Sequence, residues 1–165
     1  MVLFTWVHVA ISLVGIVSGF LVLAAFIRGK ASGCATALFL ATTVATSVTG
    51  FLFPFHHFMP SHAVGIVSLV VLAIAIYARY ARALAGGWRR TYVVTAVLAL
   101  YLNVFVLVAQ AFQKVPSLKV LAPTQSEPPF VAAQAVVMAI FIALGILAAI
   151  RFKGPVPDSQ AVTGI

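Results

Sequence analysis

The stretch FTWVHVAISLVGIVSGFLVLAAFIRGK, residues 4–30, contains a histidine near one end, basic residues at the other and an apolar run between them. A helix needs about 20 mainly apolar residues to cross a bilayer, and the run that precedes Arg28 is long enough. Basic residues at the end of a span mark the side that stays in the cytoplasm, and here they are Arg28 and Lys30. The stretch predicts a transmembrane helix whose outer end contains His8.

Four further segments share this apolar character, and most have a physical start or stop signal. Pro54 cannot continue a helix interior, Ser61 is suited to an N-cap position, and Pro129 is suited to a first helical turn. Residues 1–153 are therefore predicted to form a single transmembrane domain, and residues 154–165 a short mobile cytoplasmic tail. The predicted fold is an all-α integral membrane bundle of five transmembrane helices, at about residues 4–27, 35–53, 61–79, 91–112 and 129–150.

The composition supports a membrane location. Of the 165 residues, 64% are hydrophobic and 7% are charged, whereas a soluble domain has roughly 45–50% apolar and about 25% charged residues. The formal charge of +8 lies at the ends of apolar runs and not in one folded patch, which argues against a nucleic-acid-binding protein. The single cysteine, Cys34, excludes an internal disulfide. The expected partner is the lipid bilayer, with other membrane subunits as a further possibility.

The basic residues predict the orientation of the bundle. Alternating loops fall on two sides, and one side, with residues 28–34, 80–90 and 151–165, is strongly basic. The positive-inside rule places that side in the cytoplasm, so the N-terminus faces outward and the C-terminus faces inward. The eight basic residues in or next to these loops are Arg28, Lys30, Arg79, Arg82, Arg89, Arg90, Arg151 and Lys153.

Polar side chains gather in the outer halves of the predicted spans. Polar groups inside a membrane usually face the interior of the bundle. The inner halves are nearly bare, so the sequence predicts a polar cavity that opens outward and is closed below by apolar side chains. The outer polar residues are His8, Ser12, Thr46, Ser47, Thr49, His62, Ser68, Asn103, Gln110 and Gln134.

The histidines at the outer end are the candidate ligands. A b-type haem needs axial ligands from the protein, and His8 and His62 enter two different helices at similar depth. Imidazole also binds copper, and the soft thioether of Met59 would favour copper(I). A quinone or quinol site that uses a histidine as proton acceptor is a third interpretation. The candidate cofactor-binding residues are His8, His62, Asn103 and Gln110, and the candidate metal ligands are His8, His62, His57 and Met59.

No catalytic residues are assigned. The two acids, Glu127 and Asp158, fall on opposite predicted sides, so no carboxylate pair or Ser-His-Asp set is available. One hypothesis is a redox-linked protein that binds haem, copper or quinone. The others are an accessory or assembly subunit of a membrane complex, and a channel or carrier for a small neutral solute. A channel would need a polar track through the inner halves. The proline-bearing loop 113–128 is expected to cover the cavity or to dock a partner.

A resemblance to a known family rests on residues 40–58, 62–75 and 92–130. These runs read LATTVATSVTGFLFPFHHF, HAVGIVSLVVLAIA and YVVTAVLALYLNVFVLVAQAFQKVPSLKVLAPTQSEPPF. They are similar to an uncharacterised family of small multi-span proteins of the bacterial inner membrane. The resemblance covers roughly residues 6–151 and implies a bacterial inner-membrane location. Because the family has no assigned activity, it transfers no functional residue.

Overall fold

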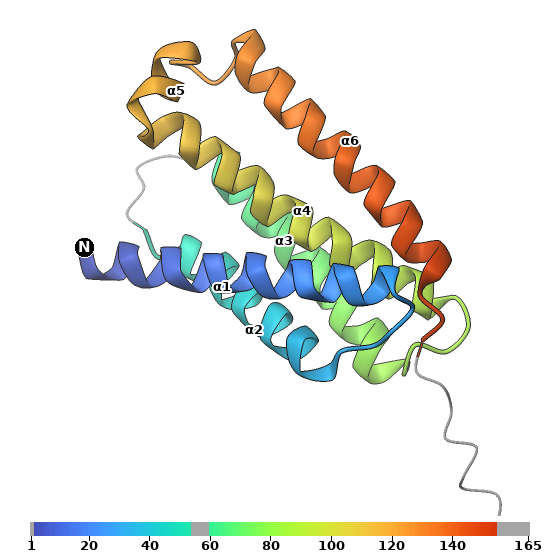
Figure 1. Cartoon of the computed structure of the whole chain (residues 1–165). Helices are drawn as coiled ribbons and strands as arrows, with labels where there is room; N and C mark the ends of the chain where they lie inside the picture. Colours follow the sequence, from blue (N-terminus) through green and yellow to red (C-terminus); the bar gives the residue numbers. More distant parts are fainter. Residues whose placement is uncertain (1, 54–59, 155–165) are drawn as a thin grey trace, which may run out of the picture.

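The computed structural model describes residues 2–53 and 60–154, and these contain helices and no β-strand (Figure 1). Five helical segments in this part of the chain are long and apolar enough to cross a membrane, which confirms the five predicted helices. The elements are α1 (Val2–Ile27), α2 (Gly33–Gly50), α3 (Pro60–Ile76), the π-helical turn η1 (Tyr77–Ala81), α4 (Trp88–Lys114), α5 (Pro116–Leu121) and α6 (Pro128–Arg151).

The helix ends differ from the predicted ones by a few residues. Helix α2 ends at Gly50, three residues early, because the amides of Phe51 and Leu52 donate to carbonyls only three residues back in a tight turn. Helix α4 begins at Trp88 and continues to Lys114, beyond the apolar run at both ends, because Arg, Gln and Lys are good helix formers although they are not apolar. The short helix α5 lies in the segment predicted to be a loop.

Four helices form a closed ring around a common interior. Helix α1 packs against α2 and α4, and α3 packs against the same two neighbours. Helices α1 and α3 are therefore on opposite sides of the ring. Helix α6 lies outside it, against α4 and α1, and α1 and α6 converge towards the basic loops (Figure 1). Below, the end of the molecule that carries His8 and His62 is called the histidine end, and the opposite end the basic end.

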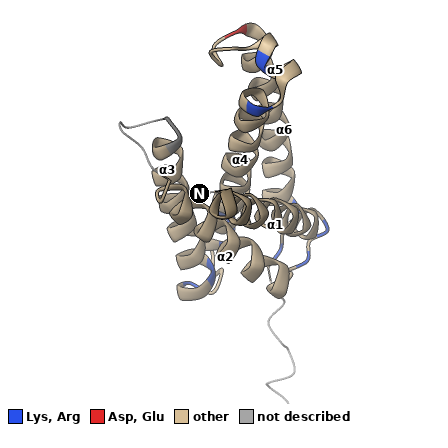
Figure 2. Ribbon diagram, turned by 90° about the vertical axis from the view of Figure 1, so that its left-hand side faces the viewer, with Lys and Arg blue, Asp and Glu red and all other residues tan. Residues whose placement is uncertain are grey.

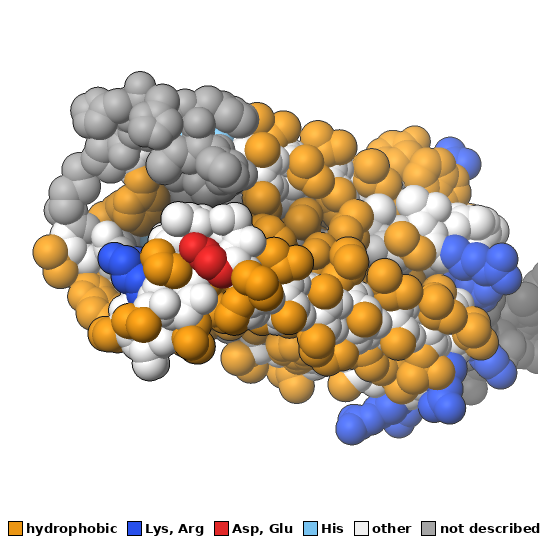
Figure 3. Space-filling model, turned by 90° about the horizontal axis from the view of Figure 1, so that it is seen from above, with side chains coloured by type: hydrophobic (Ala, Val, Ile, Leu, Met, Phe, Trp, Pro, Cys, Tyr) orange, Lys and Arg blue, Asp and Glu red, His pale blue; other side chains and the backbone are white. Residues whose placement is uncertain are grey.

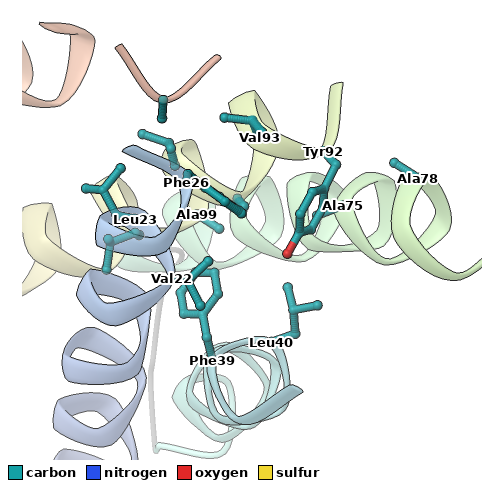
Figure 4. Packing of buried hydrophobic residues seen from close by; sticks show 14 of the residues in the cluster. Val22, Leu23, Phe26, Phe39, Leu40, Ala75, Ala78, Tyr92, Val93 and Ala99 are labelled. Carbon is teal, nitrogen blue, oxygen red and sulfur yellow. The ribbon is translucent and has the colours of Figure 1, made fainter. Parts of the chain in front are cut away.

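A cluster of buried hydrophobic residues occupies the half of the ring next to the basic end, and Figure 4 shows part of it. The ring centroids of Phe26 and Tyr92 are 5.5 Å apart, and those of Phe26 and Phe152 are 4.8 Å apart. Phe39, Leu72 and the two aromatic rings Phe26 and Tyr92 are at most 2% exposed. This buried hydrophobic cluster fills the interior where the sequence has few polar residues.

The small residues of α1 allow neighbouring helices to approach closely. A Cβ atom on Gly19 would lie 2.5 Å from Leu100 Cδ1 and 2.9 Å from the Phe39 ring. A Cβ atom on Gly15 would lie 3.2 Å from Thr42 Oγ1. Close backbone approach is a common use of small residues in membrane helices. Gly15 and Gly19 of α1 therefore allow close packing against α2 and α4.

Charged residues of the described chain lie at its two ends. Figure 2 shows Lys and Arg positions along the ribbon at the basic end, others near α5, and the acidic residue in the same upper region. Figure 3 shows a face between these ends on which hydrophobic side chains predominate. Among the exposed large hydrophobic residues are Val17, Leu21, Ile142 and Ile146. An apolar belt with charges at its borders is the surface that a bilayer stabilises.

The turn between η1 and α4 contains a strained alanine, and its replacement by glycine should relieve the strain. Ala83 has φ 47° and is exposed, and the next residue, Leu84, has φ 59° and is buried. L-residues with a side chain rarely adopt this conformation. We expect Ala83→Gly to stabilise the fold by about 1 kcal/mol, measured as a higher midpoint of thermal unfolding in detergent. Ala85→Gly, in the same turn and without a positive φ, is the control and should not stabilise.

The loop between α5 and α6 is held by side-chain hydrogen bonds. The Gln125 side-chain amide donates to the carbonyl of Ala109 over 2.6 Å. The Glu127 carboxylate accepts hydrogen bonds from the Thr124 hydroxyl and from the amides of Thr124 and Ser126. Desolvation raises the pKa of Glu127, but these hydrogen bonds lower it by more, so the pKa lies below its ordinary value. The ionised carboxylate therefore orders the loop.

Acid is expected to loosen this loop. Because the folded pKa of Glu127 is lowered, its hydrogen bonds stabilise the loop above the unfolded pKa, and the stabilisation is lost as the pH falls through the folded pKa. Hydrogen exchange at the Thr124 and Ser126 amides measures the effect, after correction for intrinsic exchange rates. Glu127→Gln should remove the pH dependence of their protection. Equal protection of the unsubstituted loop at every pH would contradict this expectation.

Candidate functional site

A cavity of about 530 Å³ lies inside the ring at the histidine end, between α1, α2, α3 and α4. Its volume is within the range of roughly 300–1,000 Å³ that is typical of ligand sites. Its walls are mostly apolar, and a small number of polar groups interrupt them. Of the polar residues predicted to face a common interior, the lining includes His8, Ser12, Thr46, Ser47, His62, Ser68, Asn103 and Gln110.

His8 is held in one orientation and one tautomer by Thr49. The ring Nδ1 lies 2.8 Å from Thr49 Oγ1. The Thr49 hydroxyl is also 2.7 Å from the carbonyl of Ala45, to which it donates its single proton. The Thr49 oxygen must therefore accept a hydrogen bond from His8 Nδ1–H, since a hydroxyl has only one proton to give. The lone pair of His8 Nε2 is then free, and His8 lines the cavity.

His62 lies across the cavity from His8, on the opposite helix of the ring. It is 5% exposed, and its ring stacks on Phe51 with centroids 5.8 Å apart and planes 29° apart. The His8 ring meets the edge of Phe53, with centroids 5.1 Å apart and planes at 87°. Both imidazoles contact the short segment that follows α2, so they lie at the same end of the ring. The structure thus brings together the two histidines that the sequence singled out.

Asn103 and Gln110 both line the cavity from α4, as their spacing of seven residues predicts. The Asn103 amide donates to Thr43 Oγ1 over 3.2 Å and so joins α4 to α2. Gln110 is closer to the histidine end of α4 and is exposed. Asn103 therefore has a structural hydrogen bond as well as a place in the wall, whereas Gln110 has no hydrogen bond with a described residue.

Other polar residues of the spans stabilise helix packing. Ser47 donates to Ser68 over 3.0 Å between α2 and α3. Gln134 does not line the cavity, and its amide donates to the carbonyl of Phe105 over 3.1 Å, which joins α6 to α4. The hydroxyl of Thr46 is buried and has no hydrogen-bond partner within the described chain. Thr46 is consequently a cavity residue with unused hydrogen-bonding capacity.

Two of the candidate metal ligands, His57 and Met59, lie outside the described residues. Within the described ranges, no group of three or more His, Cys, Asp or Glu side chains is arranged to hold a metal ion. The copper interpretation that includes these two ligands therefore stays a prediction. Of the candidate metal ligands, the described residues include His8 and His62.

The structure adds Lys114 and the ring of Phe53 to the predicted site. Lys114 is the last residue of α4 and lines the cavity with Gln110. The end of the apolar run before Lys114 predicts a loop at this position. A spacing of four residues from Gln110 places both side chains on one helix face, and that spacing was the available signal. The aromatic rings beside the histidines had no comparable signal, since they follow the end of α2.

The two ends of the cavity differ in what closes them. Towards the basic end, the buried hydrophobic cluster closes it, as the bare inner halves predict. The expectation that the loop 113–128 covers it is wrong for the described structure, because Lys114 is the one residue of this range in the cavity wall. Helix α5 packs against α4 instead. The physical reason is that Gln125 and Gln113 bind this segment to the end of α4.

Comparisons with known proteins add no assignment. No family model matches the chain, and no curated protein or solved structure matches it either. Function is therefore inferred from the cavity and its two imidazoles.

Proposed function

We propose that the chain is an integral protein of the bacterial inner membrane, with its N-terminus outside and its C-terminus in the cytoplasm. Five apolar helices and the apolar belt between two charged ends support insertion. The strongly basic end supports the orientation, because positively charged loops are retained in the cytoplasm. The cavity then opens towards the outer face of the membrane.

In this membrane protein the cavity binds a b-type haem for a redox-linked role. The observation that carries the proposal is the position of His8 and His62, on opposite helices of a four-helix ring and in the wall of one cavity. A porphyrin supplies four ligands to its iron and leaves two axial positions for the protein. Two imidazoles on facing helices meet that requirement.

A haem also fits the composition of the wall better than a bare copper ion does. The described residues provide no group of three or more His, Cys, Asp or Glu side chains that could hold a metal ion bound by protein alone. The mostly apolar wall is suited to the flat hydrophobic body of a porphyrin. A quinol would need one histidine as proton acceptor and would leave the second imidazole in the wall unexplained.

Thr49 strengthens the assignment of His8 as an axial ligand. Metal-binding histidines usually donate their other ring N–H to a neighbouring oxygen, which fixes the tautomer and the orientation of the ring. The hydrogen bond from His8 Nδ1 to Thr49 has this geometry and leaves Nε2 as the ligand atom.

A pathway for solute through the bundle is not supported, because the hydrophobic cluster fills the other half of the ring.

Titration of the purified full-length protein with haemin in detergent tests the proposal. One haemin per chain should bind, and the reduced complex should show the sharp absorption bands of a low-spin haem with two imidazole ligands. Detergent without protein is the control. Failure to bind haemin above that control would overturn the proposal. Metal analysis and a quinol titration of the same sample would then identify a copper or a quinol site.

A further inference from the structure

We infer that Lys114 and Gln110 form a carboxylate-binding subsite at the outer end of the cavity. This inference rests on the proposed haem site and assigns its orientation. The two carboxylate groups at one edge of a haem would face Lys114, and the opposite, apolar edge would face the buried hydrophobic cluster. The subsite therefore names the part of the ligand that is recognised by charge.

Lys114 is a cation without a charged partner in the described chain. Glu127 is the one acid among the described residues, and its carboxylate is occupied by hydrogen bonds from Thr124 and Ser126. The ammonium group of Lys114 is therefore available at the edge of an otherwise apolar cavity. A positive charge in this position attracts an anionic group of a ligand whose body is apolar.

Gln110 provides the second donor of the subsite. It precedes Lys114 by four residues on α4, so the two side chains lie one above the other on the same face. Both residues line the cavity and both are exposed, towards its outer end. An ammonium and a side-chain amide can each donate to a carboxylate oxygen. Deeper along the same face, the Asn103 amide donates to Thr43, so the donors without partners are those near the mouth.

The inner part of the cavity is apolar, so a ligand with one anionic edge has a single favourable orientation in it. A carboxylate moved towards the buried hydrophobic cluster would lose its hydration without gaining a cationic partner, which is costly. At the outer end it keeps contact with water and gains Lys114. A ligand with an anionic edge and an apolar body therefore enters with the anionic edge last.

Paired titrations with haemin and with its dimethyl ester, in which both carboxylates are neutralised, test the subsite. Lys114→Gln should weaken haemin binding about fivefold, as expected for a partly exposed ion pair, and should leave binding of the ester unchanged. The matched control is Lys119→Gln, which removes a lysine of α5 that does not line the cavity. It should change neither affinity.

The outcomes separate the subsite from the haem site. Equal haemin affinity of the Lys114→Gln and Lys119→Gln proteins, with a low-spin spectrum in both, would overturn the subsite and leave the haem site standing. Equal weakening of haemin and ester binding in Lys114→Gln would also overturn the subsite, because charge recognition would then be absent. If the unsubstituted protein binds neither compound, both the subsite and the proposed function are wrong.

Discussion

Replacing His8 or His62 with alanine is expected to weaken haem binding by more than about 100-fold, since removal of a residue that only orients a metal ligand already costs about 10- to 100-fold. Each single variant should also lose the low-spin spectrum, because one axial position of the iron would be left without an imidazole. Absorption spectra of the oxidised and reduced proteins at equal haem loading measure the change. The double variant should bind no haem above the detergent control.

His57→Ala tests the alternative assignment, because His57 is a candidate metal ligand that the sequence places near the same end of the molecule. It should retain the low-spin spectrum. If His57→Ala loses that spectrum and His62→Ala keeps it, the second axial ligand has been assigned to the wrong histidine. A free imidazole added to the His8→Ala or His62→Ala protein should restore the spectrum in part, which separates loss of a ligand from loss of the fold.

Thr49→Val should weaken haem binding less than the loss of His8 does. It removes the oxygen that accepts from His8 Nδ1 and keeps a side chain of nearly the same shape. Haem affinity should fall by about 10-fold or more while the iron keeps two imidazole ligands. An unchanged affinity would mean that Thr49 does not position the ring.

Gly19→Val is expected to have the largest effect on stability. The new Cβ would lie 2.5 Å from Leu100 Cδ1 and 2.9 Å from the ring of Phe39, and both neighbours are at most 1% exposed. Because a packed core has no space for such a group, we expect a loss of about 3 kcal/mol. A lower midpoint of thermal unfolding in detergent, followed by circular dichroism, measures this loss.

Gly33→Val is the control for that substitution. Gly33 begins α2, and a Cβ atom there would have no heavy atom within 4 Å. Its effect should stay within about 0.5 kcal/mol, as for most exposed positions. Equal stability of the Gly19→Val and Gly33→Val proteins would show that α1 does not pack closely against α2 and α4 at Gly19.

Much of the candidate site could be predicted from depth along each helix. His8, His62, Asn103 and Gln110 were identified because they fall in the outer half of apolar segments, and all four line the cavity. Depth follows directly from position in the sequence, since a helix rises 1.5 Å per residue. The same reasoning missed Lys114, because the end of an apolar run is a poor guide to the end of a helix.

The buried faces of α1 and α3 could not be predicted in the same way. The apolar side chains of α1 and α3 are spread around the helix, so no single stripe indicates which side is buried. Both polar and small residues were compatible with either packing or binding. The structure divides them: Gly19 and Gln134 pack helices together, whereas Gln110 and His8 face the cavity.

The sequence by itself determined the five apolar helices, the basic end and the set of polar residues at the opposite end. These properties depend on the composition of short, continuous segments, which is why they can be read without coordinates. Only the tertiary structure decided that α1 and α3 are on opposite sides of a ring, that Thr49 fixes the tautomer of His8, and that Lys114 joins the wall. These features depend on which helices become neighbours, and that choice is made by close packing between residues far apart in the chain.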